Sequence, residues 1–226
     1  MTPIIVVAYN RPKSLDRLLK SLKKAMYPSR GVSLIISIDA GDDNQKVLSV
    51  ANEFIWQHGD KKVIYQSENL GLRKHILKCG DYCIEYGSAI ILEDDLLVSP
   101  NFYAFASEAL RFSADKKYIG GISLYNHELN VLTGDYFSAR EDGYDNWYLQ
   151  FASSWGQAWS SNQWSHFKEW YSDNKSLKAH PKIPGNVQKW SEKSWLKYFI
   201  GFLIEKNMYF LFPKISLTTN FSDQGT

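Results

Sequence analysis

The sequence has little of several features that mark specialised classes of protein. It holds two cysteines, Cys79 and Cys83, among 226 residues. Their spacing matches neither a C-x-x-C metal motif nor a disulfide framework. They fall one turn apart on a predicted helix that also carries Leu72 and Ile76, so we expect both thiols to lie in the core.

Long apolar runs and strong charge are also missing. No stretch approaches the roughly 20 apolar residues that span a bilayer, and residues 4–9 lack the flanks of a signal peptide. This predicts a cytoplasmic protein, compatible with peripheral contact at the inner face of the cell membrane. Lysine and arginine number 26 against 24 acidic residues, which gives a net charge of +2 and argues against a nucleic-acid partner.

What the sequence does have is a hydrophobic content of 44%, enough for a sizeable core, and a length that suits one α/β domain. Apolar runs at residues 3–9, 33–39, 62–66 and 88–92 predict strands. Helical patterns lie between or after them: one starts near Pro12, one runs from Asn44 to about His58, one from Asn69 to about Tyr86, and one starts near Ser99. This order predicts an α/β fold with a mostly parallel central sheet and helices on both faces.

The second half, residues 126–226, is less regular. Loops or short hairpins are expected over residues 126–148, a helix around residues 195–203, and short strands at 208–212 and 215–219. We expect residues 1–125 and residues 126–226 to form two halves of the same domain. The chain stops without a polar tail, which is compatible with a truncated C-terminus.

An acidic triplet, Glu93-Asp94-Asp95, directly follows the fourth predicted strand. Ligands of parallel sheets bind beyond the carboxyl ends of the strands. Strand alternation would point Glu93 and Asp95 the same way, and hard carboxylate oxygens suit Mg²⁺ or Mn²⁺ together with substrate phosphates. A solvated acidic turn is the alternative, but the position after the strand favours a metal site.

Asp39 ends the second predicted strand. A carboxylate there can accept a hydrogen bond from a ribose hydroxyl or a uracil N–H. It can equally be a turn or helix-capping residue, because Gly41, Asp42 and Asp43 follow. The sequence leaves the two interpretations even.

The segments PIIVVAYNRP and IILEDDLLVSPNFYAF, with the strand that ends in Asp39 between them, resemble metal-dependent glycosyltransferases of the GT-A fold. The resemblance is to the Golgi N-acetylglucosaminyltransferases that begin complex N-glycans and to bacterial family 2-like transferases of surface-polysaccharide clusters. It covers residues 3–125 well and is patchier afterwards. It implies that residues 1–125 form a nucleotide-sugar-binding half and residues 126–226 the acceptor side of the same domain. It implies transfer of a hexose or N-acetylhexosamine from a nucleotide-sugar donor, UDP-linked, to a glycan or lipid-linked saccharide, with inversion.

The resemblance also implies roles for individual residues. Asp95 would be the main ligand of Mn²⁺ or Mg²⁺, with Glu93 beside it. The nucleotide would lie against Ala8, Tyr9, Asn10, Arg11, Asp39, Arg73, His75 and Asp94. Two of these have plain alternatives, since Arg73 could simply solvate its helix and His75 could be an ordinary exposed helix histidine.

A general base is harder to place. Inverting transfer needs a carboxylate that takes the proton of the acceptor hydroxyl. In the resembling enzymes it lies about a hundred residues after the metal motif, near a tryptophan, and Glu192 in the segment WSEKSW occupies that place. Related sequences carry aspartate beside the tryptophan where this chain has Ser191. Glu192 could also be a surface residue that starts a helix, and Asp142 and Asp145 are reserve candidates.

The segment WGQAW is expected to line the acceptor or sugar pocket through Trp155, Gly156 and Trp159, with core packing of the two tryptophans as the alternative. Asp223 is expected near the diphosphate. Three rival functions remain in view: a transferase that binds nucleotide without turnover, a carbohydrate-binding module and a sugar nucleotidyltransferase. The last should carry a glycine-rich phosphate loop where this chain has Asn10-Arg11-Pro12.

Overall fold

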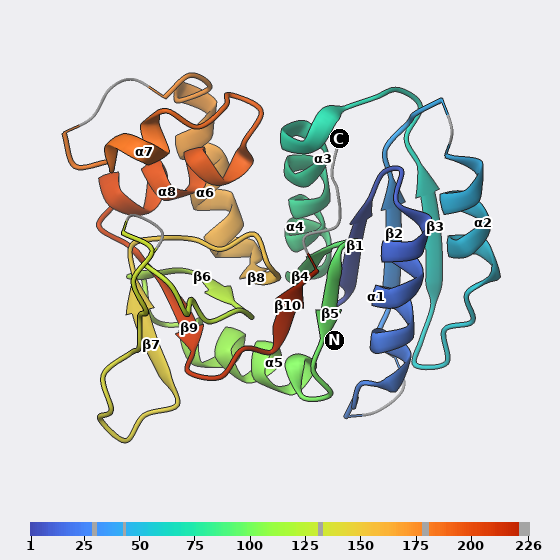
Figure 1. Ribbon diagram of the computed structural model, residues 1–226, viewed down its shortest axis with the longest axis horizontal. Helices are drawn as coiled ribbons and strands as arrows, with labels where there is room; N and C mark the ends of the chain where they lie inside the picture. The colour runs from blue at the N-terminus through green and yellow to red at the C-terminus, as the bar shows by residue number, and fades with distance from the viewer. Residues whose placement is uncertain (29–30, 43, 131–132, 178–180, 222–226) are drawn as a thin grey trace.

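A computed structural model gives the structure of the chain, and it describes residues 1–28, 31–42, 44–130, 133–177 and 181–221. Its centre is an eight-stranded sheet of order β3-β2-β1-β4-β8-β6-β9-β7 (Figure 1). The strands are β1 (Ile4–Ala8), β2 (Leu34–Ile38), β3 (Lys61–Tyr65), β4 (Ser88–Glu93), β6 (Ile119–Ser123), β7 (Asn146–Leu149), β8 (Gln157–Ser160) and β9 (Tyr209–Pro213). A small second sheet pairs β5 (Leu96–Val98) with β10 (Thr218–Asn220).

The sheet is parallel on one side and mixed on the other. The β3, β2, β1 and β4 strands run parallel, and the buried, largely apolar sequences of β2, β1 and β4 are typical of central parallel strands. The β8 strand then lies antiparallel between β4 and β6, and β7 pairs antiparallel with β9. The predicted α/β class with a largely parallel core is confirmed, and strands from the second half of the chain complete the same sheet.

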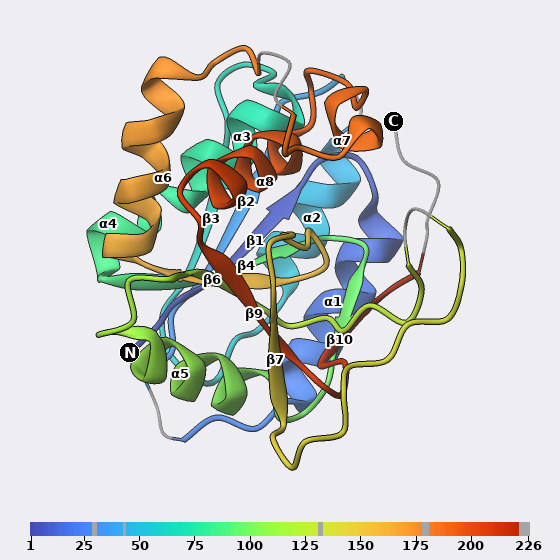
Figure 2. The same cartoon turned by 90° about the vertical axis from the view of Figure 1, so that its left-hand side faces the viewer.

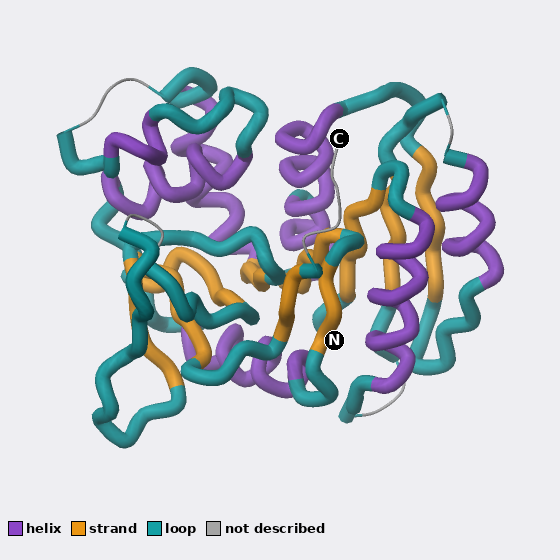
Figure 3. Tube along the Cα trace, viewed as in Figure 1, coloured by secondary structure: helices purple, strands orange, loops and turns teal. Residues whose placement is uncertain are grey.

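Helices cover both faces of the sheet (Figures 1 and 2). The helices are α1 (Pro12–Lys24), α2 (Gln45–Glu53), α3 (Gly71–Gly80), α4 (Tyr82–Tyr86), α5 (Phe102–Ser113), α6 (Ser161–Asp173), α7 (Gly185–Gln188) and α8 (Trp195–Glu205). Alternate residues of each strand feed two cores: Ile4 and Val6 pack under α1, α2 and α5, and Ile5 and Val7 pack under α3, α4, α6 and α8. Figure 3 shows the resulting layers of helix, strand and helix.

Several local predictions need correction. The second helix ends at Glu53, short of the expected His58, because Phe54 is extended and Trp56 turns inward to donate to the Val32 carbonyl. The helix expected from Asn69 to Tyr86 is two helices, broken at Asp81. Cys79 and Cys83 are buried as predicted, but Leu72 is 49% exposed, because it lies in the first turn of α3, beyond the core.

No helix in the described parts of the chain is long and apolar enough to cross a membrane. The aromatic residues of the second half instead fill the core between β8, α6 and α8. Trp159, Trp164 and Phe199 pack with ring centroids 4.9–6.5 Å apart. Their burial explains most of the tryptophan enrichment as packing.

Gly121 in β6 offers a test of this packing. A Cβ at that position would overlap the Phe210 ring and the Trp159 indole nitrogen, both in a core without free space. We expect Gly121→Ala to lower the free energy of unfolding by about 1–3 kcal/mol, measured by urea denaturation. Gly185→Ala is the matched control, because no atom lies within 4 Å of the added carbon, and it should change stability little. Equal stability of the two variants would contradict the described core.

Candidate active site at the carboxyl ends of the strands

The carboxyl ends of β2, β1 and β4 lie side by side and bring the predicted site residues together. In the register of the sheet, Ser37 faces Val7, and Val7 faces Glu93. Tyr9 follows β1 and packs over Gly41, where an added Cβ would lie 2.7 Å from the Tyr9 ring. The polar residues after these strands therefore share one edge of the sheet, as the sequence predicts.

The acidic triplet forms the end of β4 and a turn into β5. Arg11, in the turn before α1, donates to Asp94 and also to Oδ2 of Asp95, the latter at 2.9 Å. The Tyr9 backbone N–H donates to the second Asp94 oxygen at 3.4 Å. The expected strand alternation fails here because the chain turns after Glu93, so that Asp94 and Asp95 both reach Arg11.

Burial dominates the electrostatics of the triplet. Asp94 and Asp95 are 1% and 8% exposed. Burial raises the pKa of Asp94 to about 6, with the Arg11 guanidinium opposing the rise. Burial, and then repulsion from Asp95 and Asp94, raises the pKa of Glu93 to about 8, against which a hydrogen bond from Trp195 acts. Glu93 is therefore protonated at pH 7, and Arg11 pairs with the carboxylates of Asp94 and Asp95.

The triplet fits a divalent cation that substrate phosphates would complete. Oδ1 of Asp95 is buried and has no hydrogen-bond partner among the described residues. No group of three or more His, Cys, Asp or Glu within those residues could hold a metal by itself. Mg²⁺ sites commonly take one or two carboxylates plus phosphate oxygens, so one free carboxylate oxygen beside an arginine suits such a site.

Asp39 has a structural task. It is 3% exposed, and its carboxylate accepts from the backbone N–H groups of Leu70 at 2.8 Å, Gly71 at 2.9 Å and Ala40 at 3.1 Å. Asn69 adds a hydrogen bond to the Ala40 carbonyl at 2.7 Å. Asp39 thus fixes the start of α3 to the end of β2, and its contact with a nucleotide stays a prediction.

His75 is buried, at 2% exposure, so the interpretation as an exposed helix histidine is wrong. Its Nε2 lies 2.8 Å from the Ser37 hydroxyl, which also accepts from Gln66 at 2.9 Å, and Lys78 donates to Gln66. Burial lowers the pKa of His75 to about 4, so the ring is neutral at pH 7. His75 reaches the sheet and not the solvent, and a direct nucleotide contact stays a prediction.

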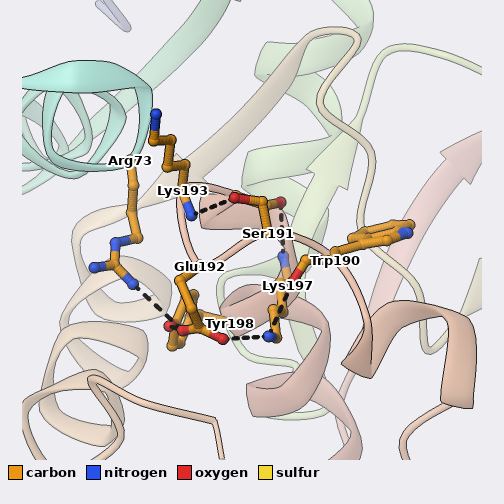
Figure 4. Close-up of polar contacts among 8 residues, drawn as sticks. Arg73, Trp190, Ser191, Glu192, Lys193, Lys197 and Tyr198 are labelled. Carbon is orange, nitrogen blue, oxygen red and sulfur yellow. Dashed lines mark hydrogen bonds and ion pairs between the residues drawn. The ribbon is translucent and has the colours of Figure 1, made fainter.

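Arg73 of α3 lies beside Glu192, which stands three residues before α8 begins (Figure 4). Glu192 accepts hydrogen bonds from Lys197 and Tyr198 and lies 4.0 Å from Arg73, whose guanidinium stands over the Tyr198 ring at 4.9 Å. The hydrogen bonds from Lys197 and Tyr198 lower the pKa of Glu192, which makes it a weaker proton acceptor. The reserve candidates lie elsewhere: Asp142 pairs with Lys214, and Asp145 is exposed beside α5.

The WGQAW segment divides between surface and core. Trp155 is partly buried and packs against Tyr125 at 4.4 Å, which suits a pocket wall. Gly156 has φ +91°, and a Cβ there would lie 2.9 Å from Thr218, so the backbone passes close to β10. Trp159 is fully buried and packs in the core, so it does not line a pocket in this structure. Asp223 lies outside the described residues.

Sequence reasoning assigned no individual role to two polar residues near this edge. Arg17 of α1 donates to the Asp95 carbonyl at 3.5 Å and stands over the Phe221 ring at 4.0 Å. Gln157 is fully buried at the start of β8. A glutamine at an inward position of a short apolar strand was the available signal for the second; for Arg17, a basic residue on an amphipathic helix, the sequence holds none.

Comparisons with known proteins agree with this geometry. The model of glycosyl transferase family 2 matches residues 4–126. The chain is similar in structure to an S. aureus TarS fragment, residues 1–349, in complex with UDP-GlcNAc, with a TM-score of 0.56 and 12% identity over 100% of this chain. A second structure of the same TarS fragment matches with a TM-score of 0.53 and 13% identity over 95% of this chain.

This chain spans 60% and 58% of those two TarS chains. At such identities the likeness shows the fold alone. No curated protein sequence matches the chain. The GT-A fold and the family 2 resemblance are thereby confirmed, and the resemblance to the Golgi enzymes stays a prediction.

Proposed function

Since the chain belongs to glycosyl transferase family 2, we propose that it moves a hexose or an N-acetylhexosamine from a UDP-sugar to a saccharide or lipid-linked saccharide. The TarS fragment of the same fold was crystallised with UDP-GlcNAc and with UDP, which supports a uridine nucleotide as the donor's leaving group. Residues 1–125 would hold the donor, and the remainder would hold the acceptor.

The free Oδ1 of Asp95, at the end of β4, is the observation that carries the proposal. It lies in a cluster where Arg11 already balances two carboxylates. Asp95, with Glu93 behind it, would hold Mn²⁺ or Mg²⁺. When bound, the cation would offset the charge that grows on the departing diphosphate.

The residues around the acidic triplet would bind the other parts of the donor. Tyr9, Asn10 and the segment anchored by Asp39 would surround the nucleoside, and the Arg11 guanidinium, which reaches Asp94 and Asp95, would also pair with the phosphates. Trp155 offers an aromatic face for the sugar. The acceptor oxygen would bond to the anomeric carbon as the bond to the diphosphate oxygen breaks, and the acceptor's proton would pass to a base.

A donor panel tests the proposal. Purified protein is incubated with UDP-glucose, UDP-galactose, UDP-N-acetylglucosamine, GDP-mannose and a CMP-sugar, with Mn²⁺ or with EDTA, and the slow hydrolysis of each donor to nucleotide and free sugar, in which water takes the place of the acceptor, is followed. Metal-dependent release of UDP from one or more UDP-sugars is expected. Release from GDP-mannose alone would overturn the choice of nucleotide, and binding of UDP without release under any condition would favour a transferase that no longer turns over.

Glu192 can be tested as the base. Because its carboxylate already accepts hydrogen bonds from Lys197 and Tyr198 and its pKa is lowered, we expect Glu192→Gln to reduce kcat less than about ten-fold, while the melting temperature falls. Lys197 and Tyr198 donate to different oxygens of Glu192, so glutamine keeps only one of the two acceptors, and it cannot take a proton. A reduction of about 10²–10⁴ in kcat with unchanged stability would instead identify Glu192 as the base, as general-base catalysis of that size predicts.

A further inference from the structure

Gln157 carries an unusual pair of polar atoms. The residue has no exposed surface, and neither its amide oxygen nor its amide nitrogen has a hydrogen-bond partner in the described structure. Burying a polar group without a partner is costly, and the large majority of buried side-chain polar atoms are paired. A fully buried amide without a hydrogen-bond partner at either end is therefore expected to pair with a ligand that the free protein does not contain.

Its place in the sheet puts Gln157 at the candidate site. It is the first residue of β8, which runs antiparallel to β4, so it lies toward the edge where β4 ends. Gln157 faces Ile91 of β4 on one side and Ser123 of β6 on the other. The residues that share its face, Ile91 and Trp159, belong to the core under α3, α4, α6 and α8, so the amide lies in that core, toward the end of β4 that carries Glu93.

The surroundings of Gln157 are polar but already occupied. By strand alternation Gln157 shares a face with Trp159, and Glu93 shares that face two residues beyond Ile91. Glu93 is hydrogen-bonded to Trp195, whose ring lies 5.8 Å from that of Trp159. The Ser123 hydroxyl donates to the Tyr125 carbonyl at 2.8 Å and accepts from the Tyr125 N–H at 3.1 Å. Glu93 and Ser123 are thus paired with other groups, and neither forms a hydrogen bond with the Gln157 amide.

We propose that the Gln157 amide reads the donor's sugar, by hydrogen bonds to a hydroxyl or acylamino group of the hexose, and so helps to set which sugar is transferred. The inference rests on the proposed function. An amide offers one acceptor oxygen and two N–H donors, which match a sugar hydroxyl or an acetamido group. Because Gln157 has no exposed surface, contact with the sugar requires the side chains around it to move. A site built to hydrogen-bond a substrate group discriminates strongly against analogues that lack it.

Gln157→Leu separates this role from a structural one. Leucine is close to glutamine in size and removes the unpaired amide, so the free protein should keep or raise its melting temperature. Gln163→Leu is the matched control: Gln163 is 5% exposed but fully paired with Ser113, Ile119 and Ser160, so its loss should lower the melting temperature. A buried water held by Gln157 would make the two variants behave alike.

Calorimetric titration then locates the contact. With Mn²⁺ present, Gln157→Leu should bind UDP within about two-fold of the wild type, but should bind the UDP-sugar that the wild type turns over about ten-fold or more weakly, as loss of a buried hydrogen bond predicts. A melting temperature lowered as in Gln163→Leu, or an unchanged affinity for the UDP-sugar, would overturn the inference alone. Failure of the wild type to bind UDP would overturn the proposed function and this inference with it.

Discussion

Replacing Asp95 with asparagine is expected to lower the rate of sugar transfer about a thousand-fold, because several kcal/mol of metal-borne stabilisation of the leaving diphosphate are lost and each 1.36 kcal/mol is a factor of ten. The amide keeps the shape of the carboxylate but lowers the negative charge on Oδ1 of residue 95, the oxygen of that side chain without a hydrogen-bond partner among the described residues. Initial rates with the preferred UDP-sugar, over a range of Mn²⁺ concentrations, measure the effect.

The control for this experiment is Asp16→Asn on α1, where the carboxylate is 45% exposed and pairs with Lys20 at the surface. Surface pairs of this kind contribute little, so activity and its metal dependence should stay as in the wild type. An Asp95→Asn variant that retains its rate and its response to Mn²⁺ would remove the triplet from the catalytic mechanism.

Replacing Asp39 with asparagine is expected to weaken both the fold and nucleotide binding. The carboxylate accepts three backbone N–H groups, and an amide placed there would turn one N–H₂ group toward another donor. Hydrogen bonds to charged groups contribute about 1.5–3 kcal/mol, so a fall in melting temperature of about 4–10 °C follows for a chain of this size. UDP affinity should fall with it, because the start of α3 borders the predicted nucleoside pocket.

Thermal denaturation with and without UDP and Mn²⁺ measures both effects of Asp39→Asn. The matched variant is Asp42→Asn, three residues further along the same loop and exposed, which should leave the melting temperature and the nucleotide-induced stabilisation unchanged. A wild-type melting temperature combined with lost UDP binding would show that Asp39 contacts the base directly and does not hold the loop.

The sequence predicts the parallel half of the fold well because the physics there is local. The runs before Asn10, Asp39 and Glu93 are apolar and rich in β-branched residues, and polar residues begin where each strand stops. Since parallel strands end at a common edge, their ends converge without further information. Arg11, Asp39 and the acidic triplet are consequently found together, as expected.

The second half of the fold cannot be predicted from local sequence patterns. The β8 strand inserts antiparallel between β4 and β6, which depends on a long-range pairing and not on its four residues. The tryptophans of residues 155–195 could face either solvent or core, and only the packing of α6 and α8 decides that Trp159 and Trp195 are buried. Glu192 was placed by resemblance, and its contacts with Lys197 and Tyr198 emerge from the tertiary structure.

The roles of individual polar residues also depend on partners that the sequence does not reveal. Asp39 and His75 stand at positions that suited a ligand, but the backbone of Leu70 and Gly71 and the hydroxyl of Ser37 are within hydrogen-bond distance. Gln157 shows the reverse case, a core position at which no partner is found among the described residues. The pairing of each buried side chain, and not its residue type, distinguishes Asp39 and His75 from Gln157.

The measurement that tests the account most directly is calorimetric titration of UDP into the wild-type protein and into Asp95→Asn, each with Mn²⁺ and with EDTA. The account predicts binding by the wild type that depends on Mn²⁺ and is lost in the variant. Equal UDP binding in all four titrations would contradict a metal at Asp95, and no binding in any of them would contradict a uridine-nucleotide site at the carboxyl ends of the strands.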